Sequence, residues 1–329
     1  MVDSSRRSAL KTLSLVAAGS GLPALAATES FPSRPIRLIV PHAAGGNSDA
    51  FGRILALKLS ERLGQQVVSE NRPGAGGTIA CALVANSPAD GYTLVVADTG
   101  THAIAPTLYG RRLQYDVFKD FTPITIAANF STALMIHPSV PAKTPQEFVA
   151  LVKSQPGKLT YSSAGTGNGS HLALELFRTA AGGLDMVHVP YKGGAPAVQA
   201  VLAGEVQLTA VSVNTSMPHI KSGRVRGLGL ASSKRSPALP DLPTFIEAGI
   251  PFEAENWLAI MGPAGIPDDI VRKLNAEIAA TLNQSDVRDR LAGTGLEVVA
   301  SSPERFREVL AQDEAKWGKA VKDSGAVVE

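Results

Sequence analysis

From Ile36 onward, short runs of branched apolar residues alternate with longer amphipathic segments, and this alternation restricts the fold more than any other feature. The run Ile36–Val40 is typical of a buried strand, and Ser48–Leu63 repeats apolar residues at helical spacing before Gly64 ends it. Strand–helix alternation at this spacing indicates βαβ units in an α/β fold with a mostly parallel sheet. Because single cores stop growing at roughly 250–300 residues, a chain of 329 residues with 44% hydrophobic content predicts two domains.

The rest of the chain follows the same alternation. Strands are expected at residues 36–40, 66–70, 93–97, 122–127, 133–136, 159–162, 186–189, 206–211, 225–231 and 258–261. Helices are expected at residues 48–63, 78–86, 145–154, 170–181, 195–203, 267–283, 286–292 and 303–324. Two such sets lie in tandem on either side of about Asn129, and the final helical segments are expected to pack back on the first set.

Two glycine-rich loops follow strands and lead directly into helices, namely Pro41–Asp49 and Ser163–His171. Ligands of open α/β sheets bind beyond the carboxyl ends of the strands. Glycines let the backbone approach a ligand, and the free N–H groups of a helix N-terminus favour an anion. We therefore interpret the two loops as a clamp for a small carboxylate. The alternative is that each is only a capped turn, with Ser48, Asp49 or Ser170 as N-cap.

Sequence signals for other chemistry are weak. The glycines of the second loop lack the G-x-G-x-x-G spacing of a dinucleotide site, and neither a P-loop nor a G-x-S-x-G elbow occurs. The six histidines have no ligand spacing, so no metal is expected. Binding through backbone N–H groups needs no cofactor, and none is expected. The single cysteine, Cys81, excludes an intramolecular disulfide and indicates a buried small hydrophobe. A serine nucleophile, Ser163 or Ser170 with His171 as base, is left as a distant alternative.

Residues 1–26 have the plan of an export signal. Arg6-Arg7 precedes an apolar run that ends in small residues, and Ala24-Leu25-Ala26 predicts cleavage before Ala27. Ala9 stands where the twin-arginine pattern prefers Phe, so export by the Sec route stays open. These residues carry the whole net charge of +2, and residues 27–329 hold equal numbers of acidic and basic side chains. We therefore expect a periplasmic protein with no nucleic-acid partner.

Several motifs of the mature chain resemble the tripartite tricarboxylate transporter substrate-binding proteins, the Bug family. They are Pro35–Pro41 followed by Gly45-Gly46 and Asp49, and residues 70–77, 90–94, 156–161, 187–193 and 234–244. The resemblance covers essentially the whole mature chain. It implies a type II periplasmic-binding-protein fold with a ligand cleft between two lobes. Lobe 1 would comprise residues 27–129 plus 232–329, and lobe 2 residues 130–231.

The resemblance implies a non-enzymatic solute receptor. Such a protein captures a small carboxylate, or a related organic acid or amide, for uptake by the permease subunits of a tripartite tricarboxylate transporter. Family members bind a carboxylate mainly through backbone N–H groups and ordered waters, so we expect bridging waters. We also expect a monomer. The alternative is a ligand-loaded sensor that signals to a membrane sensor kinase, and an exported hydrolase is the distant alternative.

The residues expected at the ligand lie mainly in the two glycine-rich loops. They are His42, Ala43, Ala44, Gly45, Asn47, Ser48, Asp49, Thr101, Ser163, Ala164, Gly165, Thr166, Asn168, Ser170, Tyr191 and Ser212. The family often has Phe-Pro-Pro where this chain has His42-Ala43-Ala44, so an imidazole is available to hydrogen-bond the ligand. Many relatives place Asp-Asn where this chain has Val211-Ser212. Because Val211 cannot contact an ammonium group, we predict no preference for an α-amino-acid zwitterion.

Overall fold

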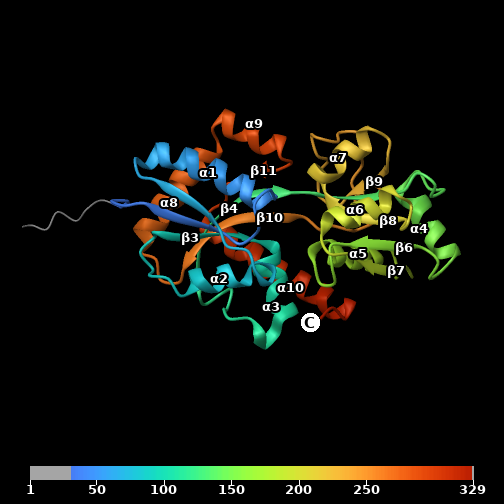
Figure 1. The fold of residues 1–329 in the computed structure, drawn as a ribbon, viewed down its shortest axis with the longest axis horizontal. Helices are drawn as coiled ribbons and strands as arrows, with labels where there is room; N and C mark the ends of the chain where they lie inside the picture. Colours follow the sequence, from blue (N-terminus) through green and yellow to red (C-terminus); the bar gives the residue numbers. More distant parts are fainter. Residues whose placement is uncertain (1–30, 328–329) are drawn as a thin grey trace, which may run out of the picture. The chain divides into compact units, whose positions relative to one another are not determined.

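The computed structural model describes residues 31–327, which form two β-sheets flanked by helices (Figure 1). The predicted export signal and its cleavage site lie outside the described residues. The first sheet has the strand order β11-β4-β10-β3-β1-β2. Its strands are β1 Ile36–Val40, β2 Val67–Asn71, β3 Thr93–Asp98, β4 Phe121–Phe130, β10 Asn256–Pro263 and β11 Glu297–Val298. The second sheet has the order β7-β6-β8-β5-β9. Its strands are β5 Thr132–Ile136, β6 Thr160–Ser163, β7 Val187–Pro190, β8 Leu208–Ser212 and β9 Arg226–Leu230.

Both sheets are mixed, which corrects the expectation of a mostly parallel sheet. Strand β1 pairs in parallel with β2 and β3, and β6 pairs in parallel with β7 and β8. In contrast, β10 is antiparallel to β3 and β4, and β5 is antiparallel to β8 and β9. The reason is the path of the chain. Strand β4 passes into β5 through Ser131 alone, and β10 brings the chain back from the second sheet, so these strands are not joined by βαβ crossovers.

The helices follow the expected order, and α4 and α10 have the predicted bounds. They are α1 Asn47–Leu63, α2 Thr78–Ala85, α3 Ala105–Tyr109, α4 Pro145–Ser154, α5 Gly169–Ala180, α6 Gly194–Leu202, α7 Val213–Lys221, α8 Asp268–Leu282, α9 Ser285–Gly293 and α10 Pro303–Ser324. A π-helical turn, Gly100–Ile104, precedes α3, and short 3-10 turns lie at Ala75–Gly77 and Gly110–Arg112. The sequence did not predict α3, α7 or β11. Helix α7 contains Pro218 and begins with Val, Asn, Thr and Ser, which are weak helix formers.

Helices cover both faces of the first sheet (Figure 1). On one face α8 packs against α1 and β4, and on the other α2 contacts β3 while α10 contacts β4. The final helices therefore pack on the first set of elements, as predicted. Trp317 of α10 is fully buried, as is Cys81 of α2, whose thiol pKa is raised by burial. In the second set, the ring of Phe177 on α5 lies 6.3 Å from that of Phe148 on α4 and 5.1 Å from that of Phe245.

Candidate functional site

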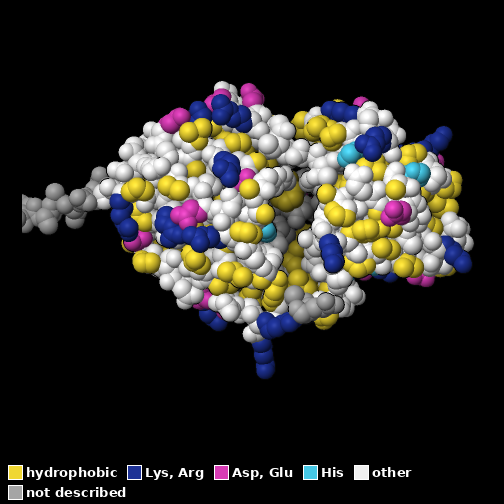
Figure 2. All heavy atoms as spheres, in the orientation of Figure 1, with side chains coloured by type: hydrophobic (Ala, Val, Ile, Leu, Met, Phe, Trp, Pro, Cys, Tyr) yellow, Lys and Arg dark blue, Asp and Glu magenta, His cyan; other side chains and the backbone are white. Residues whose placement is uncertain are grey.

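A cavity of about 600 Å³ lies between the elements of the two sheets. Its walls come from the ends of β3 and β10 on one side and from β8 and the start of β5 on the other, together with the loops that follow β1, β3, β6, β7 and β8. Figure 2 shows the surface hollowed here, with walls that are mainly uncharged. A cavity of this size suits a small organic ligand.

Four helices begin at this cavity. The lining includes first-turn residues of α1, α5, α6 and α7, namely Asn47 and Ser48, Gly169 and Ser170, Gly194 and Ala195, and Asn214 and Thr215. Within the described chain, helices α1, α6 and α7 have no side-chain cap on their first N–H groups. Each N-terminus carries a partial positive charge of roughly half a unit. The first-turn N–H groups are thus available to a bound anion.

The first loop is shaped by the buried carboxylate of Asp49. Its Oδ2 accepts the N–H of Gly45 at 2.9 Å, and its Oδ1 accepts Nε–H of Arg53 at 2.9 Å. Burial alone would raise the pKa of Asp49, but the bonds from Gly45, Arg53 and Asn71 outweigh it and lower that pKa. Gly45 has a φ of 93°, which favours glycine. Asp49 therefore folds the loop and does not line the cavity.

The second loop rests on a stack of aromatic rings. The ring centroids of His171 and His188 are 4.0 Å apart, and Tyr161 stacks on His188 at 5.0 Å. Nδ1 of His171 accepts the N–H of Gly167 at 3.1 Å, and Nε2 of His188 lies 2.7 Å from Oγ of Ser163. Burial lowers the pKa of His171 and lowers that of His188 to about 4, so both rings are neutral at pH 7. The hydrogen bond between Ser163 and His188 therefore holds the second loop in place from beneath.

Ser163 is fully buried, and its partner is His188 rather than His171. Ser170 donates to Oδ1 of Asn168, and its Oγ accepts the N–H of Ala164 at 2.9 Å. The two serines of the hydrolase alternative thus serve the loop itself. Neither serine is hydrogen-bonded to His171 in the part of the chain that the structure describes.

The structure brings half of the expected ligand residues to the cavity. Those lining it are His42, Gly45, Asn47, Ser48, Ala164, Asn168, Ser170 and Ser212. Those outside its lining are Ala43, Ala44, Asp49, Thr101, Ser163, Gly165, Thr166 and Tyr191. Tyr191 instead directs its hydroxyl to Glu205 at 3.3 Å. Thr101 is fully buried and donates its N–H to Asp98 Oδ1 at 2.8 Å.

Sequence reasoning missed Asp98, Thr99 and Gly100, which also line the cavity. Asp98 ends β3 and Thr99 and Gly100 follow it, so the rule that found the two loops could have found this turn. The cavity also contains Gly194 and Ala195 after β7, and Asn214 and Thr215 after β8. Each of these pairs likewise begins a helix after a strand.

His42 and Asp98 are hydrogen-bonded to each other at the cavity wall. Nε2 of His42 lies 2.5 Å from Oδ2 of Asp98, and the side chains are 38% and 10% exposed. Burial lowers the pKa of His42, but the attraction of Asp98 outweighs it and the net pKa is raised. The pKa of Asp98 is lowered, because His42 and the N–H of Thr101 overcome its desolvation.

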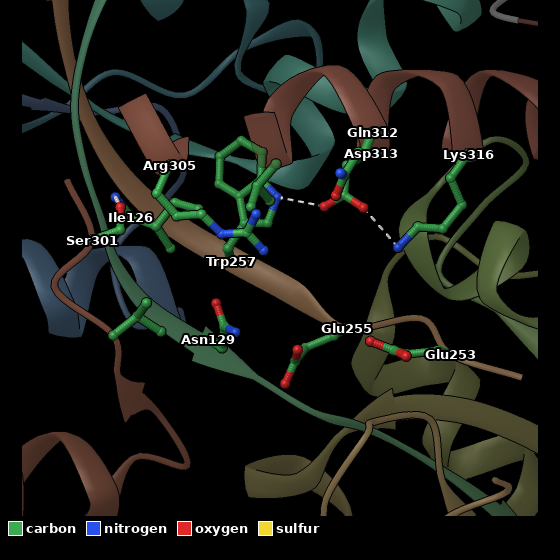
Figure 3. Close-up of a pocket in the computed structure, with 12 residues that line it drawn as sticks. Ile126, Asn129, Glu253, Glu255, Trp257, Ser301, Arg305, Gln312, Asp313 and Lys316 are labelled. Carbon is green, nitrogen blue, oxygen red and sulfur yellow. Dashed lines mark hydrogen bonds and ion pairs between the residues drawn. The ribbon is translucent and has the colours of Figure 1, made fainter. Parts of the chain in front are cut away.

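A second cavity, of about 410 Å³, lies beside β4, β10 and α10 (Figure 3). Trp257 lines it and donates Nε1–H to Oδ2 of Asp313 at 2.8 Å, and Lys316 lies 2.7 Å from the same carboxylate. Trp257 does not line the larger cavity. Its neighbours Asn256 and Leu258 line the larger cavity, and side chains alternate along a strand, so Trp257 belongs to the second one.

Within residues 31–327, no three His, Cys, Asp or Glu side chains gather where they could bind a metal ion. No helix in that range combines the length and the apolar composition needed to cross a membrane.

Comparison with known proteins places the chain among receptors. Residues 51–326 match the model of the tripartite tricarboxylate transporter family receptor. The chain is 34% identical to the protein BugT of Bordetella pertussis over 323 residues, which covers 96% of this chain and 97% of BugT.

Solved structures agree in fold. The structure of R. palustris Rpa4515 with adipate matches with a TM-score of 0.78 and 35% identity, over 90% of this chain and 99% of that one. The structure of MatC (Rpa3494) from Rhodopseudomonas palustris with bound malate matches with a TM-score of 0.74 and 34% identity, over 88% and 100%. The fold is thus the two-lobed α/β fold of these binding proteins.

Proposed function

The chain belongs to the tripartite tricarboxylate transporter receptor family, and on this basis we propose that it is an extracytoplasmic solute-binding protein that captures a small carboxylate for uptake by a membrane permease. It acts as a monomer, without a cofactor, after cleavage near Ala26-Ala27. N-terminal sequencing of the protein recovered from the periplasm tests the cleavage, and a start before Ala27 would contradict it.

One observation carries the proposal: four helix N-termini meet at one cavity whose described lining contains neither Lys nor Arg. Preorganised N–H groups favour an anion without the desolvation cost of burying a cationic side chain. Enclosure of the ligand removes water and strengthens each charge-assisted hydrogen bond. Bridging waters complete the contacts that the backbone does not reach directly.

Closure is a hinge motion of two lobes in this proposal. Lobe 1 comprises residues 27–129 plus 232–329 and lobe 2 residues 130–231, with the hinge where the chain crosses between the sheets. The N–H of Val213 donates to the carbonyl of Ser131 at 3.0 Å, and the N–H of Ala254 donates to that of Ala231 at 2.9 Å. These bonds at the two crossings support a pivot there, because a few residues at element ends absorb such rotations.

The ligand is a carboxylate that lacks a free α-amino group. Adipate and malate, named in the structures of two relatives, are small dicarboxylates, and they set the starting panel. Val211 lines the cavity, and the nearby carboxylate of Asp98 is already paired with His42. The described lining therefore has no unpaired acidic side chain that could bind an ammonium group.

A thermal-shift screen of the mature protein tests this function. A carboxylate at a thousandfold excess over its Kd adds about 4 kcal/mol to the stability of the folded state. The melting midpoint should then rise by roughly 6 °C, because a chain of this size has an unfolding entropy of about 0.6 kcal/mol per kelvin. Dimethyl esters of the same acids are the matched control, because they keep the carbon skeleton and lose the charge. No shift with any carboxylate, or tight calorimetric binding of aspartate or glutamate, would contradict the proposal.

A further inference from the structure

His42 is the one residue lining the larger cavity, within the described chain, whose side chain can become a cation. The only other ionisable side chain in that described lining is the one of Asp98. The pair therefore sets the net side-chain charge of the cavity. With His42 protonated the pair is neutral, and with His42 neutral the ionised Asp98 leaves one negative charge facing the ligand.

The two carboxylate oxygens of Asp98 have different partners, and this fixes the orientation of the His42 imidazole. Oδ1 of Asp98 accepts the N–H of Thr101 at 2.8 Å and its Oγ1–H at 3.2 Å, so Oδ2 is left for His42. An ionised carboxylate only accepts hydrogen bonds, so Nε2 of His42 carries the proton between them. Nδ1 of His42 bonds to no group of residues 31–327. It accepts a hydrogen bond when the ring is neutral and donates one when the ring is charged.

The groups around His42 favour its charged form. Asp98 of β3 is in direct contact, and its attraction raises the pKa of His42 despite burial. Beyond Asp98, the buried ring of His102 is neutral, because burial lowers its pKa to about 4. On α1, Asp49 is ion-paired with Arg53. The surroundings of the imidazole therefore favour its protonated form.

The cavity also offers more donors than one carboxylate can use. A carboxylate has about four lone-pair sites. Uncapped first turns of α1, α6 and α7 and the second glycine-rich loop all reach the cavity. The remaining donors call for a second acidic group in the ligand.

We propose that His42, positioned against Asp98, binds a second carboxylate of the ligand and takes up a proton from solvent at Nδ1 when a dicarboxylate binds. This inference rests on the proposed receptor function and names its ligand class. His42 is then a specificity-determining residue, and Asp98 is a positioning residue that acts through it. Since a bound anion favours the imidazolium, affinity is highest at low pH and falls as the pH rises past the ordinary histidine range.

Calorimetry with adipate, malate and monomethyl adipate tests the inference. For the wild-type protein we expect the Kd of the better dicarboxylate to rise about tenfold between about pH 6 and about pH 9. Titration in two buffers of different ionisation enthalpy should show proton uptake near neutral pH. Monomethyl adipate should bind weakly and without this pH dependence.

Variants separate the subsite from the rest of the cavity. H42F should bind the dicarboxylate at least about tenfold more weakly and lose the proton uptake. Because H42F leaves Asp98 unpaired, the double variant H42F/D98N checks that the loss does not come from misfolding. D98N alone should move the pH dependence to lower pH. H219Q, which changes a histidine outside the cavity, should behave as wild type.

Different results would contradict the receptor function and the His42 subsite. If wild-type protein binds no carboxylate at any pH, the receptor function fails. If a dicarboxylate binds with unchanged affinity across this pH range, or if H42F binds it as well as wild type, the His42 subsite is overturned and the receptor function stands. Equal binding of monomethyl adipate and adipate would also overturn the subsite.

Discussion

At the residue scale, Gly77 fixes the wall behind His42 without touching the cavity. Its φ is 95°, in the left-handed region that favours glycine. A Cβ there would lie 2.7 Å from Cγ2 of Thr101, 3.0 Å from Cβ of Pro41 and 3.4 Å from Cε1 of His42. Because Gly77 has only a hydrogen atom in place of a side chain, the first loop and the turn after β3 can pack together.

Gly77→Ala should damage both stability and binding. We expect the free energy of unfolding to fall by about 1–3 kcal/mol from backbone strain and contact, and the ligand Kd to rise because Pro41 and His42 are displaced. Denaturant unfolding and calorimetry measure the two effects. Gly64→Ala is the matched control, because Gly64 has a φ of 65° and a Cβ there would meet no heavy atom of the described chain within 4 Å. Equal affinities for the two variants would contradict this role of Gly77.

The sequence predicted His42, Asn47 and Ser48 at the cavity because they lie between a strand and a helix. It could not predict that Asp98 pairs with His42 across 56 positions of sequence. That contact depends on β1 and β3 being neighbours in the sheet, which spacing alone does not establish. Thr101, predicted as a ligand residue, is instead buried in the local turn after β3, where its N–H donates to Oδ1 of Asp98.

At the element scale, β10 separates two cavities with different chemistry. Asn256 and Leu258 face the larger cavity, and Trp257 faces the smaller one (Figure 3). Glu255, just before the strand, lines the smaller cavity. Burial first, and then the charge of Glu253, raises the pKa of Glu255 to about 7. A carboxyl whose pKa is raised in the folded state prefers to be neutral there.

Glu255→Gln should therefore stabilise the protein at alkaline pH. The cost of ionising Glu255 is absent below its ordinary pKa of 4.5, grows as the pH rises, and is complete above about 7. We expect a gain of about 1–3 kcal/mol near pH 8, allowing for solvent screening, and almost none near pH 4. Melting midpoints across this range measure it. Glu308→Gln, at an exposed pair with Arg305, should show no such trend, and a uniform shift in Glu255→Gln would contradict the assignment.

Helices with clear caps and apolar spacing were predictable from the sequence. Features that depend on the path of the chain between the two sheets were not. Helices α4 and α10 matched because their N-cap residues and apolar spacing are local signals. The strand directions were not predicted correctly. Only the crossings between the sheets make β4, β5 and β10 antiparallel to their neighbours, and no local pattern indicates these crossings. The N-terminus of α7 at the cavity was missed with the helix itself.

At the scale of the whole molecule, loops and helices that flank the two sheets contact each other at more than one place. A Cβ on Gly167, in the second loop, would lie 2.7 Å from Leu108 of α3. Gly295, after α9, lies against Asn214 of α7, with a Cβ position 3.0 Å from the Asn214 Cβ. Helix α10 contacts β4 of the first sheet and α5 beside the second. Tandem sets of elements were predictable, but these contacts arise only once both sets are folded.

The convergence of helix N-termini on a cavity whose described lining has no Lys or Arg has a consequence for ionic strength. Partial charges on enclosed N–H groups are screened little by dissolved ions, whereas exposed charges more than a Debye length apart, about 10 Å at 0.1 M, are largely screened. Outside the predicted export signal the chain has equal numbers of acidic and basic residues, so long-range steering of an anion is also weak.

We therefore expect the Kd and the association rate to change by less than about threefold between roughly 0.05 M and 0.5 M NaCl. Stopped-flow binding at fixed pH measures both, with the salt sodium chloride throughout. A steep loss of affinity with salt would mean that distant surface charges attract the ligand. Constant capture at changing salt concentrations would suit the proposed extracytoplasmic function.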